Sequence, residues 1–293
     1  MQHRDKTILL KIISELDVAL DMIIGIDFES FNTNELLKRA TCMTVINMQR
    51  PFESEVLYGF LITLVLSALL LVVLLLGSMW LFRTREYTRR VVISSLVGVS
   101  NSGFMGYPII LAVNPDWMIY AVAYNIAFIF ICWTLDVSLF RRDGGVDLRR
   151  VLLNPNLISS VIGFALFCLG LTLPAVITEV LSMVGGLTTP LTMLLIGTRM
   201  IGLKITEFKN RDYHYTALLR LVVLPLALYA LLLPTPLPAA VKGVMFLLTA
   251  MPAGSTTSMM AELYGKDADF AARGVAYTTL LSLVSIPLMC QLL

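Results

Sequence analysis

The stretch Ser100-Asn101-Ser102-Gly103-Phe104-Met105-Gly106-Tyr107-Pro108 interrupts an otherwise apolar run from Val91 to Val113. A glycine in a helix interior costs about 1 kcal/mol relative to alanine. Pro108 has no N–H to donate, and its ring clashes with the carbonyl four residues before it. The run is therefore predicted to break here. Since an unpaired backbone group in hydrocarbon costs several kcal/mol, the break must be buried in protein or line a polar cavity, which makes it a candidate site.

The composition of the chain is that of a membrane protein with several spans. Of its 293 residues, 57% are apolar and only 14% are charged, whereas soluble domains carry about 25% charged residues. Helical spans of roughly 20 residues would use nearly the whole chain, and about eight are clear in the sequence. We therefore expect an all-α polytopic membrane protein without a separate soluble domain.

The clear spans follow one another from Glu55 onward. They are predicted at Val56–Phe82, Val91–Val113, Trp117–Phe140, Val151–Leu173, Val176–Met200, Tyr215–Leu233, Ala239–Tyr264 and Phe270–Leu292. Every second loop carries Arg and Lys, at 83–90, 141–150 and 204–211, whereas the loops at 114–116, 174–175 and 234–238 carry none. Because cation-rich loops stay on the cytoplasmic side, the protein is predicted to lie in the cell membrane with its C-terminus outside the cytoplasm.

Residues 1–50 do not follow this pattern. The segment 7–28 has an apolar face, but it also carries Lys11, Glu15, Asp17 and Asp21. One charge at the centre of a spanning helix costs about 2.5–3.5 kcal/mol, so this segment is predicted to be amphipathic, an interfacial or poorly ordered leader. It lacks the cleavage site of a signal peptide. We expect residues 1–50 to be a divergent or truncated N-terminal segment.

The rest of the chain has the pattern of two repeats with opposite topology. One unbroken span, one span interrupted by Gly and Pro, and one further span make up residues 51–140, and the same order recurs with reversed direction at 215–292. Transporters built from inverted repeats have this pattern, with interrupted helices that meet near the middle of the membrane. We assign 51–140 to the remainder of a first repeat, 141–150 to a cytoplasmic loop and 151–293 to a second repeat.

The second interrupted span contains Thr249-Ala250-Met251-Pro252-Ala253-Gly254-Ser255-Thr256-Thr257-Ser258, in which a proline and a glycine lie among hydroxyl side chains. The N-terminal ends of half-helices carry free N–H groups and a partial positive charge, so such breaks favour an anion. Their small side chains would let the two breaks cross closely. The alternative is a pair of ordinary kinks, which membrane helices tolerate. Corresponding positions in oppositely oriented halves favour a transport site.

At several places the sequence resembles the auxin efflux carrier family of membrane transporters. These places are Asn101–Pro108, Ala250-Met251-Pro252-Ala253, Ala261-Glu262-Leu263-Tyr264-Gly265-Lys266-Asp267 and Ser285-Ile286-Pro287-Leu288, within a resemblance that covers roughly residues 42–293. The resemblance implies ten helices in two inverted five-helix repeats, two broken helices that cross, and a scaffold with a mobile bundle. It also implies organic anions as substrates, such as auxin in plants and dicarboxylates in bacteria. The first two helices of the family are not recognisable here, apart from 41–46, which resembles part of the second.

The breaks and the resemblance together provide the expected substrate-binding residues. The breaks contribute Asn101, Ser102, Gly103, Gly106 and Pro108, followed by Pro252, Gly254, Ser255 and Thr256. The resemblance adds Tyr124 and Asn125, which it places on the helix beside the crossing.

The predicted function is secondary transport of small organic anions by alternating access around the crossing helices, with H⁺ or Na⁺ as the candidate coupling ion. The absence of a Walker A sequence argues against ATP as the energy source. Two alternatives stay open: a sodium-coupled bile-acid-type symporter, and a transport-inactive membrane regulator. An enzyme is not expected, because no nucleophile has an evident base and no deep carboxylate has a partner.

The expected partners are the lipid bilayer and, for assembly, a second copy in a homodimer. The four cysteines are isolated in the sequence, so we expect neither a disulfide framework nor a metal site. No cofactor and no nucleic-acid partner are expected.

Three charged side chains within the spans have more than one interpretation. Asp136 is a candidate proton carrier, but Arg141 and Arg142 follow about one turn later and favour an interfacial ion pair. Arg220 lies about one turn inside its span and is predicted to extend to the membrane surface. Glu262 is predicted to lie on the surface.

Overall fold

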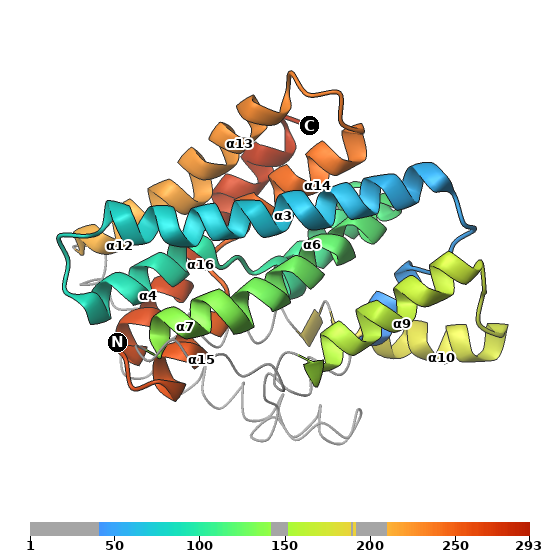
Figure 1. The fold of residues 1–293 in the computed structure, drawn as a ribbon, viewed down its shortest axis with the longest axis horizontal. Coiled ribbons are helices and arrows are strands. Elements are labelled where there is room, and N and C mark those ends of the chain that lie inside the picture. The colour runs from blue at the N-terminus through green and yellow to red at the C-terminus, as the bar shows by residue number, and fades with distance from the viewer. Residues whose placement is uncertain (1–40, 142–151, 189, 192–209) are drawn as a thin grey trace, which may run out of the picture.

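The computed structural model describes residues 41–141, 152–188, 190–191 and 210–293, which form a bundle of helices (Figure 1). Four features predicted from the sequence lie wholly or partly outside the described residues. They are the amphipathic segment 7–28, the cationic loop from 142 onward, the end of the Val176–Met200 span, and residues 204–209 of the next cationic loop.

Two groups of three spans make up most of the described chain. The first group consists of α3 (Ser54–Leu81), α4 (Tyr87–Gly98) with α5 (Tyr107–Val113), and α6 (Met118–Ile131) with α7 (Val137–Phe140). The second group consists of α12 (Arg211–Leu218) with α13 (Leu224–Leu232), α14 (Ala239–Ala250) with α15 (Ser255–Leu263), and α16 (Ala268–Cys290). Three π-helical turns connect paired helices, at Ser102–Gly106, Cys132–Asp136 and Leu219–Val223, and the short 3-10 turn Pro115–Trp117 precedes α6.

Within the ranges that the structure describes, four continuous helical stretches are long and apolar enough to cross a membrane. They are Ser54–Leu81, Pro115–Phe140, Arg211–Leu232 and Ala268–Cys290. On α3, a row of exposed side chains recurs every three or four residues and consists of Tyr58, Leu61, Val65, Leu69 and Val73. Such an apolar stripe on the outside of a bundle is suited to lipid contact. The prediction of an all-α polytopic membrane protein is confirmed.

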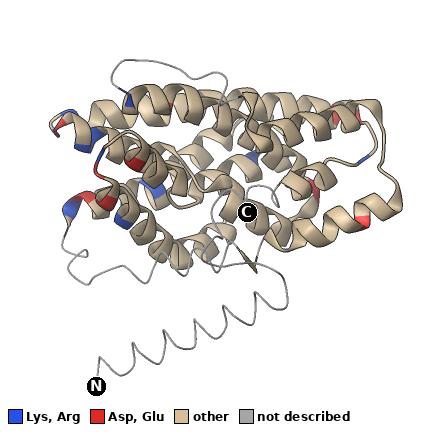
Figure 2. Ribbon diagram, turned by 90° about the horizontal axis from the view of Figure 1, so that it is seen from below, with Lys and Arg blue, Asp and Glu red and all other residues tan. Residues whose placement is uncertain are grey.

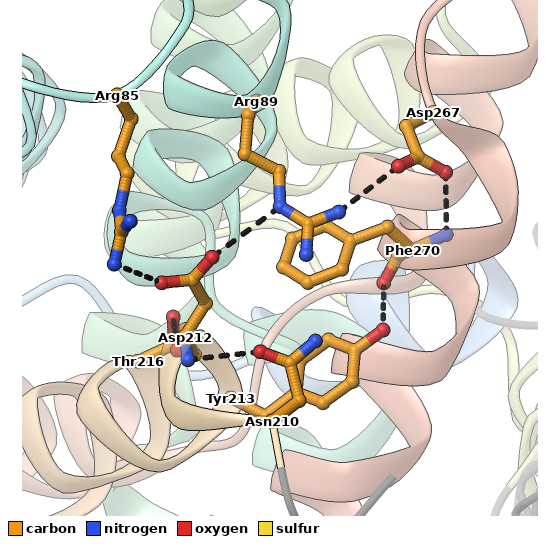
Figure 3. Close-up of polar contacts among 8 residues, drawn as sticks. All are labelled: Arg85, Arg89, Asn210, Asp212, Tyr213, Thr216, Asp267 and Phe270. Carbon is orange, nitrogen blue, oxygen red and sulfur yellow. Dashed lines mark hydrogen bonds and ion pairs between the residues drawn. The ribbon is translucent and has the colours of Figure 1, made fainter.

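Polar contacts bring several helix ends together at one end of the bundle (Figure 3). Arg85 Nη2 lies 2.7 Å from Asp212 Oδ1, and Arg89 Nη1 lies 3.0 Å from Asp267 Oδ2. The Tyr213 hydroxyl donates to the Phe270 carbonyl at 3.3 Å. Exposed ion pairs of this kind contribute about 0–1 kcal/mol each, so their main effect is to align the starts of α4, α12 and α16. We call this region the charged end.

The opposite end of the bundle is defined by a second set of contacts. The Tyr229 hydroxyl at the end of α13 donates to the Leu292 carbonyl at 2.8 Å, and Lys242 Nζ in α14 donates to the Thr235 carbonyl at 2.6 Å. Among the described residues, most Lys and Arg lie at the charged end, on the left in Figure 2. The membrane side that each end faces stays a prediction from the positive-inside rule.

These two ends give every span a direction. In the first group, α3 and α6–α7 run towards the charged end while α4–α5 runs away from it. In the second group, α14–α15 runs towards the charged end while α12–α13 and α16 run away from it. The two groups therefore have the same order of spans and opposite directions, as the sequence pattern predicts.

A smaller layer lies beside the two groups and contains α9 (Pro155–Leu169), α10 (Ala175–Gly186) and the helical residues 41–47. A Cβ at Gly185 would lie 3.1 Å from the Met43 backbone, so the glycine permits a close approach of these helices. The Phe60 and Phe164 rings stack with centroids 4.4 Å apart and join α3 to α9. This layer is therefore attached to the first group partly through aromatic contacts.

Candidate functional site

The two interrupted helices cross at their breaks, as predicted. Ser100 and Ala253 form an antiparallel β-bridge. Two backbone hydrogen bonds flank it, from Asn101 N to Pro252 O (2.9 Å) and from Gly254 N to Val99 O (2.8 Å). Each break thus supplies partners for backbone groups that the other leaves free. This exchange removes most of the cost of unwinding a helix at membrane depth.

The first break is shorter than the predicted stretch and lies at its start. Helix α4 ends at Gly98, and the chain is helical again from Ser102. The Asn101 carbonyl accepts from both Met105 N (3.2 Å) and Gly106 N (3.0 Å), which produces a π-helical turn. Pro108 follows directly after this turn, so its missing N–H falls where the π-helical turn has already changed the hydrogen-bond pattern. The glycines and the proline therefore follow the break instead of forming it.

The second break, between α14 and α15, is fully extended. Met251 and Gly254 have ψ angles of 148° and 141°. The Thr278 hydroxyl of α16 lies 3.2 Å from Ala253 N and accepts its hydrogen bond. A Cβ at Gly254 would lie 3.1 Å from the Ser100 carbonyl oxygen, so a glycine is needed for the close approach of the two breaks.

Arg220 connects the C-terminal ends of the two half-helices α4 and α14. Its side chain is 0% exposed. Nε donates to the Met251 carbonyl at 2.9 Å, and Nη1 donates to the Val97 carbonyl at 2.8 Å. The guanidinium therefore neutralises two partial negative charges at once, while Nη2 has no hydrogen-bond partner among the described residues. The prediction that Arg220 extends to the membrane surface is wrong.

The N-terminal ends of the other two half-helices start close to the crossing. The helical segment after the first break begins at Ser102, and α15 begins at Ser255, each two residues after a bridged residue. The side chain of Asn101, the N-cap of the first of these helices, makes no hydrogen bond to the first turn, and Gly254, the N-cap of α15, has no side chain to make one. Each end keeps its partial positive charge and N–H groups for another acceptor.

Two glycines of the first break differ in how tightly they are packed. A Cβ at Gly103 would have the Asn125 Oδ1 atom as its nearest neighbour, at 3.6 Å. In contrast, a Cβ at Gly106 would lie 2.5 Å from the Leu248 side chain, so Gly106 serves packing against α14. Partly exposed residues border the crossing on both half-helices; they are Gly103, Phe104, Ser255 and Thr256.

Helix α6 forms one wall of the crossing. The Tyr124 hydroxyl lies 3.4 Å from Ser100 Oγ, and Asn125 Oδ1 lies 3.5 Å from Ser102 Oγ. These distances are long for hydrogen bonds, so small movements would free the groups for another partner. Tyr124 also lies beside the guanidinium of Arg220.

The structure therefore brings together most of the residues predicted from the sequence. Those that lie buried at the crossing are Asn101, Ser102, Tyr124, Asn125, Pro252 and Gly254. Gly103, Ser255 and Thr256 are partly exposed at the half-helix N-termini, whereas Gly106 and Pro108 lie further along the first half-helix. Arg220 was missed as a site residue, although its position inside an apolar span was a usable signal.

Asp136 is also placed differently from the prediction. The carboxyl group is 0% exposed, and Oδ2 accepts from the Ser95 hydroxyl at 2.9 Å. Ser95 Oγ in turn lies 2.9 Å from the Thr257 hydroxyl. Among the described residues Asp136 has no ion pair, so the predicted interfacial pair with Arg141 is wrong, and Arg142 lies outside the described residues. The π-helical turn Cys132–Asp136 turns this residue towards α4 and α15.

One smaller prediction can be tested as well. Glu262 is exposed, as predicted. Within the part of the chain that the structure describes, no three His, Cys, Asp or Glu side chains are arranged to hold a metal ion.

Comparison with known proteins agrees with this architecture. The sequence matches the family described as "Membrane transport protein" over residues 42–290. It is also similar to an uncharacterized transporter of Methanothermobacter thermautotrophicus, with 24% identity over 196 residues. That match spans 64% of this chain and 63% of the relative.

Proposed function

This chain belongs to the membrane transport protein family, the auxin efflux carrier family, and on that premise we propose that it moves small organic anions across the cell membrane as a secondary transporter. The observation that carries this proposal is the charge arrangement at the crossing. Two half-helix C-termini are neutralised by Arg220, whereas the two N-termini at Ser102 and Ser255 have no side-chain cap. The crossing therefore has a net positive potential, which suits a carboxylate.

The same arrangement argues against a sodium ion at the crossing. In transporters with broken helices, the C-terminal ends of half-helices and unwound carbonyls coordinate the coupling cation. Here the Val97 and Met251 carbonyls accept hydrogen bonds from Arg220. The proposal is therefore a sodium-independent carrier, in contrast to the bile-acid-type symporter.

In alternating access, two parts of the fold would move relative to each other. The groups containing the crossing form one unit, and the layer of 41–47, α9 and α10 forms the other. Where α3 meets this layer, stacked aromatic rings such as Phe60 and Phe164 can slide without breaking strong polar contacts. Movement of one unit against the other would then open the crossing to each side of the membrane in turn.

Uptake into proteoliposomes tests the proposal directly. The purified protein is reconstituted, and uptake of labelled indole-3-acetate, succinate and malate is measured with and without a sodium gradient. We expect uptake of at least one of these anions, unchanged when potassium replaces sodium. Asn101→Ala should lower it, because the side chain borders the crossing and has no protein hydrogen bond to lose among the described residues.

The matched control is Thr134→Ala, whose exposed hydroxyl bonds only to the Phe130 carbonyl of its own helix. This variant should keep full uptake. A folded protein that moves none of the anions under either gradient would refute the proposal and favour a transport-inactive membrane regulator. Uptake that requires sodium would favour the bile-acid-type symporter.

A further inference from the structure

Asp136 is a buried carboxyl group that the proposed anion site does not use. It lies on the π-helical turn between α6 and α7, with 0% of its surface exposed. Oδ2 accepts one hydrogen bond from Ser95, and Oδ1 has no partner. Transfer of an ionised carboxylate into such an environment costs several kcal/mol unless an opposite charge compensates it.

The surroundings of Asp136 offer no such compensating charge among the described residues. On its own helix the nearest titratable group is Cys132, which is buried one turn earlier. On α4 the group in contact is the neutral Ser95, and Arg89 in the first turn is bound to Asp212 and Asp267. On α15 the facing group is Thr257. The other charged groups of these segments lie towards the charged end; they are Arg90, Arg141, Glu262 and Lys266.

A proton can supply the missing charge within the observed geometry around Asp136. The oxygen pairs Asp136–Ser95 and Ser95–Thr257 are each separated by 2.9 Å, the spacing of a hydrogen bond. One proton on Oδ1 would make the group neutral without moving any of these atoms. The carboxyl would then carry one donor and keep its acceptor for Ser95.

The position of this group connects it to the crossing. Ser95 belongs to the last turn of α4, the half-helix whose Val97 carbonyl accepts from Arg220. Thr257 belongs to the first turns of α15, the half-helix that begins at Ser255. Asp136 therefore contacts one half-helix of each break through a single chain of hydrogen bonds. When ionised, it would add a negative charge to this chain and lower the positive potential of the crossing.

We propose that Asp136 is a proton-binding site of the crossing, and that its ionisation lowers the affinity of the crossing for anions. The second part rests on the proposed function. The proton binds to Oδ1 and leaves the carboxyl neutral, so the potential at the half-helix N-termini stays positive. Since coupling is reciprocal, a bound anion increases proton binding at Asp136.

Infrared difference spectroscopy tests the proton site without any substrate. Purified protein in lipid nanodiscs is titrated from mildly acid to alkaline pH, and the C=O band of protonated carboxyl groups is followed. We expect a band that is present in the wild type and absent in Asp136→Asn, while Glu262→Gln, which changes an exposed carboxyl, keeps it. A titrating band that is the same in Asp136→Asn would overturn the proposal.

Uptake of indole-3-acetate then tests the coupling, at pH values where its carboxyl is ionised. The affinity of the wild type should fall about tenfold or more as pH rises, which is a typical coupling between two sites. Asp136→Asn is permanently neutral and should keep the high affinity at every pH. Asp136→Glu should restore the pH dependence, which separates charge from a general structural effect.

The outcomes are distinguishable. A pH dependence that persists in Asp136→Asn would overturn the inference and leave the proposed transport intact. If no anion is taken up at any pH, the proposed function and the coupling fail together, whereas the infrared band still decides whether Asp136 binds the proton.

Discussion

The two breaks share backbone hydrogen bonds but are built differently. The first break returns to a helix through a π-helical turn, and a Cβ at its Gly103 would make only an ordinary contact with Asn125. The second break is extended and tightly packed, with Gly254 against the Ser100 carbonyl and Ala253 N bound to Thr278 of α16. The second break is therefore the more tightly packed side of the crossing, and the first break tolerates more change.

This difference shows that two sequence segments with similar composition can provide hydrogen-bond partners for the backbone groups of a broken helix in different ways. The first break satisfies the Asn101 carbonyl locally, through N–H groups four and five residues later. The second break depends on another helix for Ala253 N. Variants that affect both breaks, one break or a single hydrogen bond can separate these contributions.

The largest effect is expected for Arg220→Met, which affects both breaks at once. The Val97 and Met251 carbonyls lose their donor, and each buried unpaired carbonyl costs about 1–3 kcal/mol, or about 2–6 kcal/mol together. Thermal unfolding in detergent should show the loss of stability. The matched control is Arg211→Met at the exposed start of the same span, which should change stability little. Equal stability of both variants would show that Arg220 does not hold the crossing together.

An intermediate effect is expected from adding one methyl group to either break. Gly254→Ala should cost about 1–3 kcal/mol, because the new Cβ would meet the Ser100 carbonyl oxygen at 3.1 Å. Gly103→Ala should leave stability nearly unchanged, since the nearest neighbour of the new Cβ would be 3.6 Å away, yet it should reduce anion uptake by placing a methyl group beside the Asn125 oxygen at the proposed site. Unfolding midpoints and uptake rates measured on both variants check this pair. If Gly103→Ala instead destabilises the protein as much as Gly254→Ala, the two breaks are equally tight.

The smallest effect is expected for Thr278→Val, which changes only the second break. The substitution keeps the shape of the side chain but removes the acceptor for Ala253 N, at a cost of about 1 kcal/mol because the bond is long at 3.2 Å. Hydrogen–deuterium exchange should increase around Ala253 and stay unchanged around Asn101. Thr278→Ser retains the hydroxyl and is the control. Faster exchange at both breaks would indicate that they open as one unit.

Much of the architecture could be predicted from the sequence. The spans, their alternating directions and the two interruptions were all visible, because long apolar segments, cationic loops and Gly/Pro clusters are local features. The exact position of the first break could not be predicted. The backbone of Val99 and Asn101 pairs with the other break, and the glycines and Pro108 are then accommodated in the helical segment that follows.

The two buried charges show what local reasoning misses. Arg220 and Asp136 lie near the ends of their spans, so extension to the surface or an interfacial ion pair was the reasonable expectation. The structure turns both inward, to carbonyls of the breaks and to Ser95. Both residues are on or next to π-helical turns, whose extra residue changes the face on which a side chain lies.

Hydropathy and backbone chemistry act over short stretches, so the amino-acid sequence was enough to predict a helical membrane protein with two interrupted spans in oppositely directed halves. The pairing of Ser100 with Ala253, the link that Arg220 makes between both half-helix C-termini, and the burial of Asp136 became visible in the folded chain alone. A broken helix leaves its backbone groups unpaired, and their partners come from segments far away in the chain.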